Sequence, residues 1–468
     1  MRTLVWLRND LRVADNPALS SAMEAGEAVA VFCICARQWR AHDVGDNRLG
    51  FLLDSLHGLA AELGRLGVPL RIITEPWFAD VPRRLVKLAT ELGAGALVCN
   101  DEYPLNEQLR DAQVARACAD AGIAMHMHHA GTLLPPGAVL TQSGEPYTVF
   151  SPFKKRWMSR LEPAGYEPLA VPRRQRRPSV ADSPLPQRLD GVARDQVEGR
   201  WPGGPAEAQR RLQEFVSDRV LRYHQDRDFP ALDGTSTLSP YLAVGSISAR
   251  QCLHAAVQAN GGSLHSGSPG VLAWINELVW RDFYRHVVAH FPHVSRGRAF
   301  RREMDAMPWR HAPAEYQAWK AGRTGYPLVD AAMRQLAETG WMHNRLRMVT
   351  AMFLSKHLLL DWRLGERHFM NLLVDGDFAA NNGGWQWSAA TGTDAAPYFR
   401  IFNPVTQAQR FDPQGTFVRR YVAELREAPL PAVLDPAKHG FVGYPRPMVD
   451  HRAARQRALD SFKALRRG

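Results

Sequence analysis

The sequence lacks the features that define several classes of protein. No stretch approaches the roughly 18 consecutive apolar residues of a membrane-spanning helix, and the first residues, MRTLVWLRND, become charged again too early for a secretory signal peptide. The five cysteines are odd in number, scattered and never spaced as C-x-x-C. This argues against a disulfide framework or a zinc site and predicts buried thiols. We therefore expect a cytoplasmic protein with no membrane partner.

An ordinary dinucleotide fingerprint is also missing. The first apolar run is followed by RNDLRVADNPAL and not by G-x-G-x-x-G. What is present is a globular composition, with 45% apolar residues in a chain of 468, and a basic balance of 58 Lys+Arg against 47 Asp+Glu. The length predicts two to three domains, and the net charge of +11 is compatible with a polyanionic partner.

Short apolar runs alternate with helical patterns over residues 1–131. The runs expected to form strands are 3–8, 28–35, 69–74 and 96–100, and the helical patterns are 50–67 and 80–93, both ending at glycine. Alternation of strand and helix predicts a parallel α/β sheet. The segment MHMHH (125–129) could be taken for metal ligands, but its alternation favours a half-buried strand.

The composition changes twice further along the chain. Residues 132–203 are rich in proline and include RRQRR (173–177), which predicts a long, mostly irregular connection with a solvated basic face. Beyond residue 204 helical patterns dominate. We predict three parts, an α/β domain over 1–131, a linker over 132–203 and a helical domain over 204–468.

A hydroxyl-rich turn, DGTSTLSPYLAVG (233–245), begins a short helical pattern. Ser239 is expected to cap that helix, with Pro240 as its first residue. Together with Thr235, Ser236 and Thr237, the free N–H groups of this helix end could hold a phosphate. An ordinary capped helix start is the alternative.

The segment WINELVWRDFYRHVVAHF, from Trp274 to Phe291, is expected to form a helix with two different faces. A core face is formed by Ile275, Leu278, Val279, Phe283 and Val287, and a polar, aromatic face by Trp274, Glu277, Trp280, Arg281 and Tyr284. A helix that only packs would not align a carboxylate, a guanidinium and three aromatic rings. The second face therefore indicates a pocket for a planar, partly anionic ligand.

A second helix is predicted within TGWMHNRLRMVTAMFLSKHLLLDW (339–362). Its expected pocket face carries Trp341, Asn344, Met348, Ala351 and Ser355, with Arg345 at the edge. Core packing of Trp341 and Met348 is the alternative.

The segment 375–404, DGDFAANNGGWQWSAATGTDAAPYFRIFNP, combines acids, amides, glycines and tryptophans with few aliphatic residues. Buried amides and carboxylates need hydrogen-bond partners, which a polar aromatic ligand would provide. A glycine-rich surface loop is the alternative. We expect Gly383 and Gly384 to form a tight turn that directs Trp385 and Trp387 to opposite sides.

Three blocks, WINELVWRDFYRH, GYPLVDAAMRQLAETGWMHNRLRM and the segment 375–404, resemble the signature blocks of the photolyase/cryptochrome family. They are most similar to those of the bacterial class I DNA photolyases specific for cyclobutane pyrimidine dimers, and the resemblance extends over nearly the whole chain. It implies an α/β N-terminal domain with a parallel, Rossmann-like sheet that holds an antenna chromophore. It also implies an all-α C-terminal domain that holds FAD.

The resemblance assigns the flavin contacts by position. Asn381 matches the asparagine that faces flavin N5, and Arg347 with Asp375 resembles the ion pair beside the ring. The full set of implied FAD contacts is Tyr223, Thr235, Ser236, Thr237, Leu238, Ser239, Trp274, Glu277, Arg281, Asn344, Arg347, Asp375, Asp377 and Asn381.

The implied activity is light-dependent repair of ultraviolet-damaged DNA by a monomeric enzyme. Excited FADH⁻ gives an electron to a flipped-out cyclobutane pyrimidine dimer, the two C–C bonds open, and the electron returns. The residues expected to carry the reaction are Glu277, Trp280, Asn344, Met348, Asn381 and Trp387. Those expected to contact DNA phosphates are Arg227, Arg281, Arg345 and Arg400.

Two further roles follow from the resemblance. Trp385, Trp362 and Trp309 match the tryptophans that carry an electron inward to the flavin. Asn106 and Glu107 match a pair that holds methenyltetrahydrofolate, whereas Ser295-Arg296 stands where Cys-Lys is expected. The folate is therefore expected to be weakly held, absent or replaced by a deazaflavin.

Three other functions remain open. A (6-4) photolyase uses a histidine pair where this chain has His343-Asn344, and a signalling cryptochrome usually lacks the Glu277/Met348 combination and often carries a long tail after the helical domain. A flavoprotein without a DNA role is disfavoured by Trp280, Trp387 and the arginines.

Overall fold

The computed structural model describes residues 2–193, 197 and 199–465. It divides into two compact units. The first unit is Met1–Leu221, Ser236–Pro292 and Val374–Gly376, and the second is Arg222–Thr235, His293–Leu373 and Asp377–Gly468. The predicted boundaries at 131 and 203 stay predictions, because compactness does not test which segments fold independently. None of the helices in the described residues is long and apolar enough to cross a membrane.

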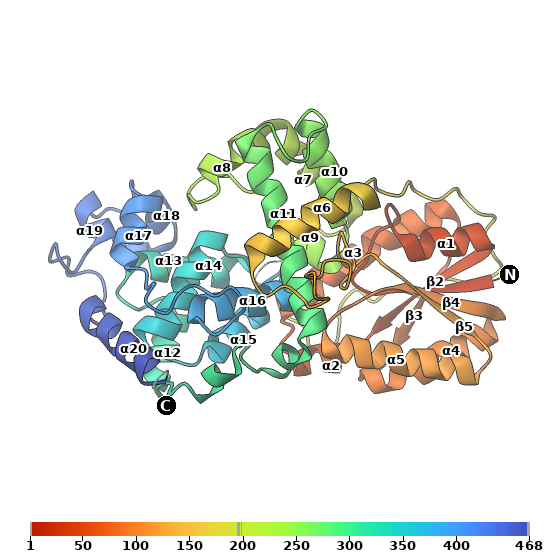
Figure 1. Ribbon diagram of the computed structural model, residues 1–468, viewed down its shortest axis with the longest axis horizontal. Helices are drawn as coiled ribbons and strands as arrows, with labels where there is room; N and C mark the ends of the chain where they lie inside the picture. The colour runs from red at the N-terminus through yellow and green to blue at the C-terminus, as the bar shows by residue number, and fades with distance from the viewer. Residues whose placement is uncertain (1, 194–196, 198, 466–468) are drawn as a thin grey trace. The chain divides into compact units, whose positions relative to one another are not determined.

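A five-stranded parallel sheet forms the centre of the first unit, with the strand order β3-β2-β1-β4-β5 (Figure 1). The strands are β1 (Arg2–Leu7), β2 (Glu27–Ile34), β3 (Leu70–Thr74), β4 (Ala94–Asn100) and β5 (Ala124–His128). Leu4 of the central strand pairs with Val29 on one side and Leu97 on the other. The predicted parallel α/β sheet is confirmed, and so is the strand expected in MHMHH.

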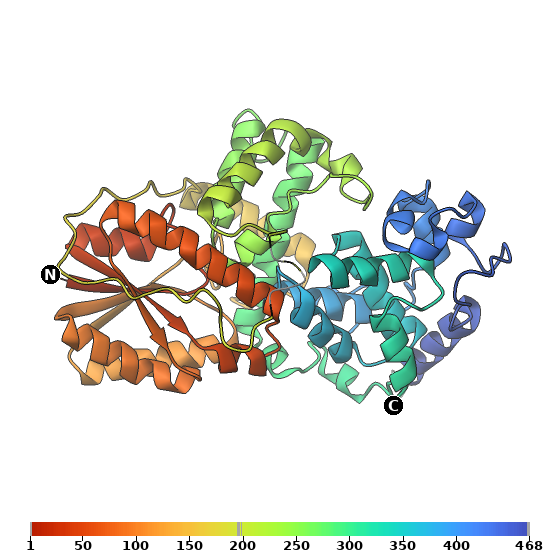
Figure 2. The same cartoon turned by 180° about the vertical axis from the view of Figure 1, so that it is seen from behind.

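Helices cover both faces of this sheet (Figures 1 and 2). Helices α1 (Pro17–Ala25) and α3 (Asp46–Leu66) lie on one face, and α4 (Val81–Glu91) and α5 (Leu105–Asp120) on the other. Gly67 ends α3 with φ +73°, the left-handed conformation that favours glycine at this position. All five cysteines are free and buried, as predicted.

Helix α6 (Phe150–Ala164) lies within the segment that was predicted to be a mostly irregular linker. Its buried residues, Phe150, Phe153, Trp157 and Leu161, recur at helical spacing and form one packed face. The rest of the described part of 132–203 is irregular, as expected. The prolines and arginines around this segment led to the prediction of an irregular linker, although the helical spacing is present in the sequence.

Helices dominate the chain beyond residue 204, as predicted. Those of the first unit are α7 (Pro205–Glu214), α9 (Ser239–Val244), α10 (Ala249–Ala259) and α11 (Pro269–His290), besides the short α2 (Ala36–Ala41). Those of the second unit are α8 (Tyr223–Asp226), α12 (Pro313–Lys320), α13 (Pro327–Thr339), α14 (Asn344–Met352), α15 (Trp362–Leu372), α16 (Phe378–Ala389), α17 (Pro404–Phe411), α18 (Thr416–Tyr421), α19 (Leu430–Leu434) and α20 (His451–Leu465).

Two predicted helix starts are wrong. Helix α14 begins at Asn344, because Gly340 ends α13 with φ +65° and Trp341 lies in the connection between the two helices. Trp341 therefore does not share a helix face with Asn344. Helix α9 has Leu238 at its N-cap and Ser239 inside, so Ser239 does not cap it, and Leu238 makes no side-chain cap.

The predicted turn at Gly383 and Gly384 is also wrong, because both glycines lie inside α16. Asp377 caps this helix by accepting a hydrogen bond from the Ala380 N–H at 3.0 Å. Packing of α16 against α14 and α15 outweighs the low helix propensity of glycine. Trp385 and Trp387 point to different sides because residues two apart on a helix are about 200° apart.

Candidate functional site

The two predicted faces of α11 are confirmed in the first unit. The five residues of the expected core face are buried, with Ile275, Val279 and Phe283 at 0% exposure. On the other face Trp274 is buried, whereas Glu277, Trp280, Arg281 and Tyr284 are half-buried. This face therefore presents a carboxylate, a guanidinium and aromatic rings that a ligand can reach.

The Arg281 side chain is hydrogen-bonded to the segment that follows β5. Its Nη1 donates a hydrogen bond to the Gly131 carbonyl at 3.2 Å, and Arg285 donates to the same oxygen at 2.8 Å. The fully buried carboxylate of Asp282 lies 4.0 Å from Arg281. These contacts fix the direction of the Arg281 side chain, and its roles toward flavin and phosphate stay predictions.

The turn before α9 is held by its own polar groups. Thr237 adopts φ +50°, an uncommon conformation for a β-branched residue, and its hydroxyl accepts a hydrogen bond from Arg211 at 2.9 Å. The Ser236 hydroxyl accepts from the Leu238 N–H at 3.4 Å. Leu238 is buried, while Ser239 is exposed. A basic side chain and hydroxyl groups thus lie together at this turn. Asp375, another predicted flavin contact in the first unit, is buried, with 5% of its surface exposed.

In the second unit, α14 and α16 pack against each other and bring two groups of predicted residues together. On α14, Asn344 is exposed, and Arg347 and Met348 are half-buried. The ring of His343 caps α14 by accepting the Arg345 N–H at 3.2 Å. Burial lowers the pKa of His343 to about 4, so this ring is neutral at pH 7 and keeps the lone pair that the cap requires.

The arginines predicted to contact DNA differ in their surroundings. Arg345 forms an ion pair with Asp228 at 2.9 Å and lies 4.5 Å above the ring of Phe411. Arg227 lies 5.4 Å from the ring of the buried Tyr223. Arg400 is exposed, and its carbonyl accepts a hydrogen bond from Lys356 at 2.9 Å. Arg400 is therefore the most exposed of these three arginines.

Polar side chains on α16 form a buried network. The amide of Asn381 donates to the Glu366 carbonyl at 3.0 Å, and Asn382 donates to the Glu366 carboxylate at 2.8 Å. Gln386 donates to Asn382 at 2.9 Å and accepts from the Phe300 N–H at 2.7 Å. The bond to Glu366 fixes the amide of Asn381, which is 8% exposed.

The three tryptophans assigned to electron transfer lie in or against one hydrophobic core of the second unit. Trp385 and Trp362 are 2% and 0% exposed, whereas Trp309 is half-buried. Two of the three rings are therefore enclosed by the core, and Trp309 is the one that solvent partly reaches. Trp319, which the sequence did not single out, contacts Trp385 edge-on with ring centroids 6.1 Å apart.

Trp385 is closely surrounded. Its ring meets Phe369 edge-on at 5.0 Å, and a Cβ added at Gly365 would lie 2.1 Å from its Cη2 atom. Position 365 therefore has no room for a side chain. Trp387, on the other side of α16, is half-buried and reachable by a ligand.

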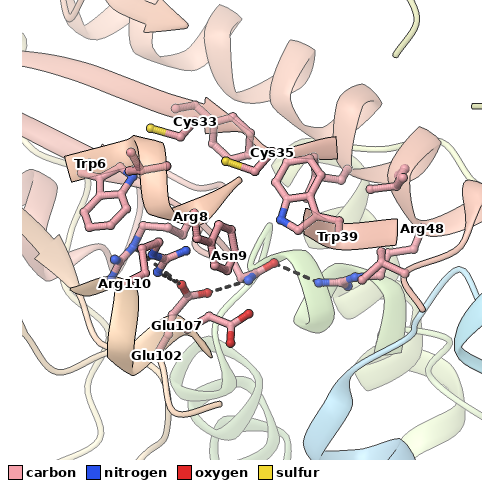
Figure 3. Close-up of a pocket in the computed structure, with 16 residues that line it drawn as sticks. Trp6, Arg8, Asn9, Cys33, Cys35, Trp39, Arg48, Glu102, Glu107 and Arg110 are labelled. Atoms are coloured by element: carbon pink, nitrogen blue, oxygen red, sulfur yellow. Dashed lines mark hydrogen bonds and ion pairs between the residues drawn. The ribbon is translucent and has the colours of Figure 1, made fainter. Parts of the chain in front are cut away.

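A cavity in the first unit lies beyond the carboxyl ends of β1, β2 and β4, where the strand order reverses (Figure 3). Ligands of parallel α/β sheets commonly bind at such a position. Its empty space, including the part open to solvent, is about 630 Å³. The lining residues are Trp6, Arg8, Asn9, Phe32, Cys33, Cys35, Trp39, Val44, Arg48, Leu49, Leu52, Phe78, Val81, Glu102, Glu107 and Arg110.

Several charged groups in this cavity form hydrogen bonds or ion pairs with one another. Glu102 accepts from Arg110 at 2.7 Å and from Asn9 at 2.6 Å, as Figure 3 shows. Burial, together with the charge of Glu102, raises the pKa of Glu107 to about 7. Glu107 can thus donate or accept a proton near neutral pH. Asn106 does not line the cavity, and its amide lies 3.2 Å from the His42 ring.

Comparisons with known proteins cover both units. A family model described as DNA photolyase matches residues 3–173, and one described as the FAD binding domain of DNA photolyase matches residues 274–464. The deoxyribodipyrimidine photo-lyase of Escherichia coli K12 is 43% identical over 99% of both chains. A solved class III photolyase from Agrobacterium tumefaciens is 36% identical, with a TM-score of 0.89 over 100% of this chain and 98% of that one. The archaeal photolyase of Sulfolobus tokodaii, solved with two FAD molecules, is 30% identical with a TM-score of 0.82 over 99% and 100%.

Proposed function

Because this chain belongs to the DNA photolyase family, we propose that it uses light to split cyclobutane pyrimidine dimers in ultraviolet-damaged DNA. Its enzyme class is then deoxyribodipyrimidine photolyase, a carbon–carbon lyase. The observation that carries this proposal is the half-buried face of α11, which aligns Glu277, Trp280 and Arg281 in a chain that matches a deoxyribodipyrimidine photo-lyase over its full length.

FAD is the cofactor that the family implies, and the residues present suit it. The buried Asp375 and Asn381 offer polar partners for a flavin edge, Trp274 offers an apolar wall, and the hydroxyls of Ser236 and Thr237 suit a pyrophosphate. When bound in its reduced form, FAD supplies the electron that opens the dimer and receives it back. The remaining proposed contacts are Tyr223, Thr235, Leu238, Ser239, Arg347 and Asp377.

The damaged pyrimidines must leave the duplex to be repaired, and photolyases are among the enzymes that extrude their target base. We propose that Glu277 accepts an N–H from the dimer and that Trp280 and Trp387 stack on its rings. Asn344 and Met348 are the other proposed contacts of the dimer. Each of these side chains is half-buried or exposed, as a residue that receives a ligand must be.

Phosphates on either side of the dimer would meet arginine. Arg400 and Arg227 are two of the proposed phosphate contacts, and Arg345 would have to exchange Asp228 for phosphate. Arg281 would act from a fixed direction, because Gly131 holds it. DNA binding should therefore weaken with salt.

We also propose the cavity of the first unit as the antenna site. Its walls include Trp6, Phe32, Trp39 and Phe78, which suit a planar chromophore, and Glu107 offers it a hydrogen bond. Asn106 is directed to His42, so only one residue of the predicted folate pair faces the cavity. Methenyltetrahydrofolate, a deazaflavin and a second flavin are the candidates, because each carries a planar ring system. Mass spectrometry of chromophores released from protein purified from its natural source would identify which is bound.

The repair reaction is testable with defined substrates. Chemically reduced protein is incubated with duplexes that carry one cyclobutane dimer or one (6-4) photoproduct, under blue light and in the dark, and the products are separated by chromatography. We expect repair of the cyclobutane dimer under light only. Repair of the (6-4) product, or of neither lesion, would contradict the proposal. We expect a monomer in the cytoplasm, and the molecular mass in solution tests the first of these.

A further inference from the structure

Phe150, a residue outside the predicted site, is in direct contact with Trp280. Their ring centroids are 3.5 Å apart and their planes differ by 2°. Aromatic pairs generally prefer offset or edge-to-face arrangements to a direct face-to-face stack. The Phe150–Trp280 pair is therefore closer to a direct face-to-face stack than most aromatic pairs.

The position of Phe150 is fixed by the packing of α6 on α11. Phe150 belongs to the buried face of α6, on which Phe153 meets Phe283 at 5.1 Å and Trp157 donates a hydrogen bond to Asp282 at 3.0 Å. Asp282 is fully buried and also accepts the Leu133 N–H at 2.9 Å. Phe150 is thus part of the packed α6–α11 contact as well as a neighbour of Trp280.

Two further rings surround the Trp280 indole. Phe283 meets it edge-on at 5.7 Å and 78°, and Tyr284 lies at 5.6 Å and 30°. Phe150 is 7% exposed, whereas Trp280 is half-buried. The indole is therefore backed by protein on the face that meets Phe150 and remains partly accessible elsewhere.

We propose that Phe150 is a positioning residue for recognition of the damaged bases. It covers one face of Trp280 and holds the indole in a fixed plane, so that a flipped pyrimidine stacks on a ring that is already ordered. An unsupported indole would lose side-chain freedom when the dimer binds, and that loss weakens binding. The inference rests on the proposed function, because it assumes that Trp280 stacks on the dimer.

The test replaces the flat ring and keeps its apolar volume. Phe150→Leu should weaken dark binding to a duplex with one cyclobutane dimer by about tenfold, with unchanged binding to the undamaged duplex. Phe150→Tyr keeps the ring and should bind within about twofold of the wild type. Fluorescence anisotropy measures both affinities, and flavin content and Tm show that each variant is folded. If Phe150→Leu does not fold, Phe150→Met takes its place.

Phe153→Leu is the matched control, since Phe153 lies on the same face of α6 and its ring packs on Phe283 and His286. It should lower Tm without changing the preference for damaged DNA. In a Trp280→Ala background, Phe150→Leu should cause no additional loss of binding.

Unchanged binding by Phe150→Leu, an equal loss in Phe153→Leu, or an additional loss in the Trp280→Ala background would each overturn the role of Phe150. Failure of the wild type to prefer the damaged duplex would instead overturn the proposed function.

Discussion

The half-buried face of α11 and the buried side of α16 both place tryptophan beside polar side chains, but the rings have different surroundings. Trp280 on α11 is backed by Phe150 and is half-buried. Trp385 on α16 is enclosed by Phe369, Trp319 and Gly365 and is 2% exposed. A ring of the first kind can stack on a ligand, whereas one of the second kind can only pack or exchange an electron. The difference in burial thus fits the two separate roles proposed for these tryptophans.

The largest effect that would sharpen this contrast is expected from Trp309→Phe. Phenylalanine is much harder to oxidise than tryptophan, so the proposed path through Trp362 and Trp385 should be interrupted at its half-buried end and photoreduction of the bound flavin abolished. Dimer repair by chemically reduced enzyme should remain. Flavin absorbance during illumination with a reductant measures the first, and product chromatography the second.

Trp77→Phe is the control for this experiment, because Trp77 is 42% exposed and lies outside the proposed path. Photoreduction at the wild-type rate in Trp309→Phe would remove Trp309 from the path.

The second effect concerns the half-buried face of α11. Glu277→Ala should weaken binding to dimer-containing DNA by about 10- to 100-fold, because the dimer's N–H would be left without an acceptor, at a cost of about 1–3 kcal/mol. Light-driven reduction of the flavin should persist if Trp280 and Trp385 serve separate functions. Binding titrations and flavin absorbance measure the two properties on the same sample.

Glu303→Ala is the control, because it removes the same charge from an exposed glutamate outside the proposed site. If Glu303→Ala weakens binding to damaged DNA as strongly as Glu277→Ala, general electrostatics and not a specific contact explains the loss.

Stability should respond in opposite directions to alanine at two glycines. Gly365→Ala places a Cβ against the Trp385 ring and should lower the free energy of unfolding by about 1–3 kcal/mol, as overpacking does. Gly384→Ala, on α16 with no atom within 4 Å of the added Cβ, should raise it by roughly 0.5–1 kcal/mol. Chemical denaturation measures both. Equal effects would show that the enclosure of Trp385 is looser than the structure indicates.

The last effect is a pH dependence of stability that comes from the buried Lys356 in the second unit. Burial, followed by the charge of Arg400, lowers the pKa of Lys356 from 10.5 to about 7. Between these values the unfolded chain binds the additional proton, so the free energy of unfolding rises with pH, by at most about 1.4 kcal/mol per unit. Lys356→Met should therefore flatten the dependence between pH 7 and 8.5.

Lys438→Met, which removes an exposed lysine of the same unit, should leave that slope as in the wild type. Urea unfolding at several pH values measures it. Identical slopes for wild type and Lys356→Met would contradict a lowered pKa for Lys356.

The sequence was sufficient for features that repeat locally. Short apolar runs flanked by glycine, proline or charge predicted the strands, and the periodicity of α11 separated its core face from its polar face. It was insufficient where one signal opposed another. Proline and arginine around Phe150 concealed α6, and the glycine pair suggested a turn where Asp377 and tertiary packing maintain a helix.

Contacts between distant residues were beyond the sequence altogether. Phe150 and Trp280 are separated by 130 positions, and no periodicity in either segment indicates that they stack. The same holds for the burial of Lys356 and for the cavity beside Glu107. The assigned roles of the site residues stay predictions that the experiments above test.

The contact between Gly365 and Trp385 also constrains how this sequence can diverge. A larger residue at 365 collides with the indole, while a smaller residue at 385 leaves a cavity beside Phe369. Each change is harmful alone, although the two together could restore the packing. Random mutation must therefore pass through an impaired intermediate, which makes the pair epistatic and tends to preserve a buried tryptophan for reasons unrelated to electron transfer.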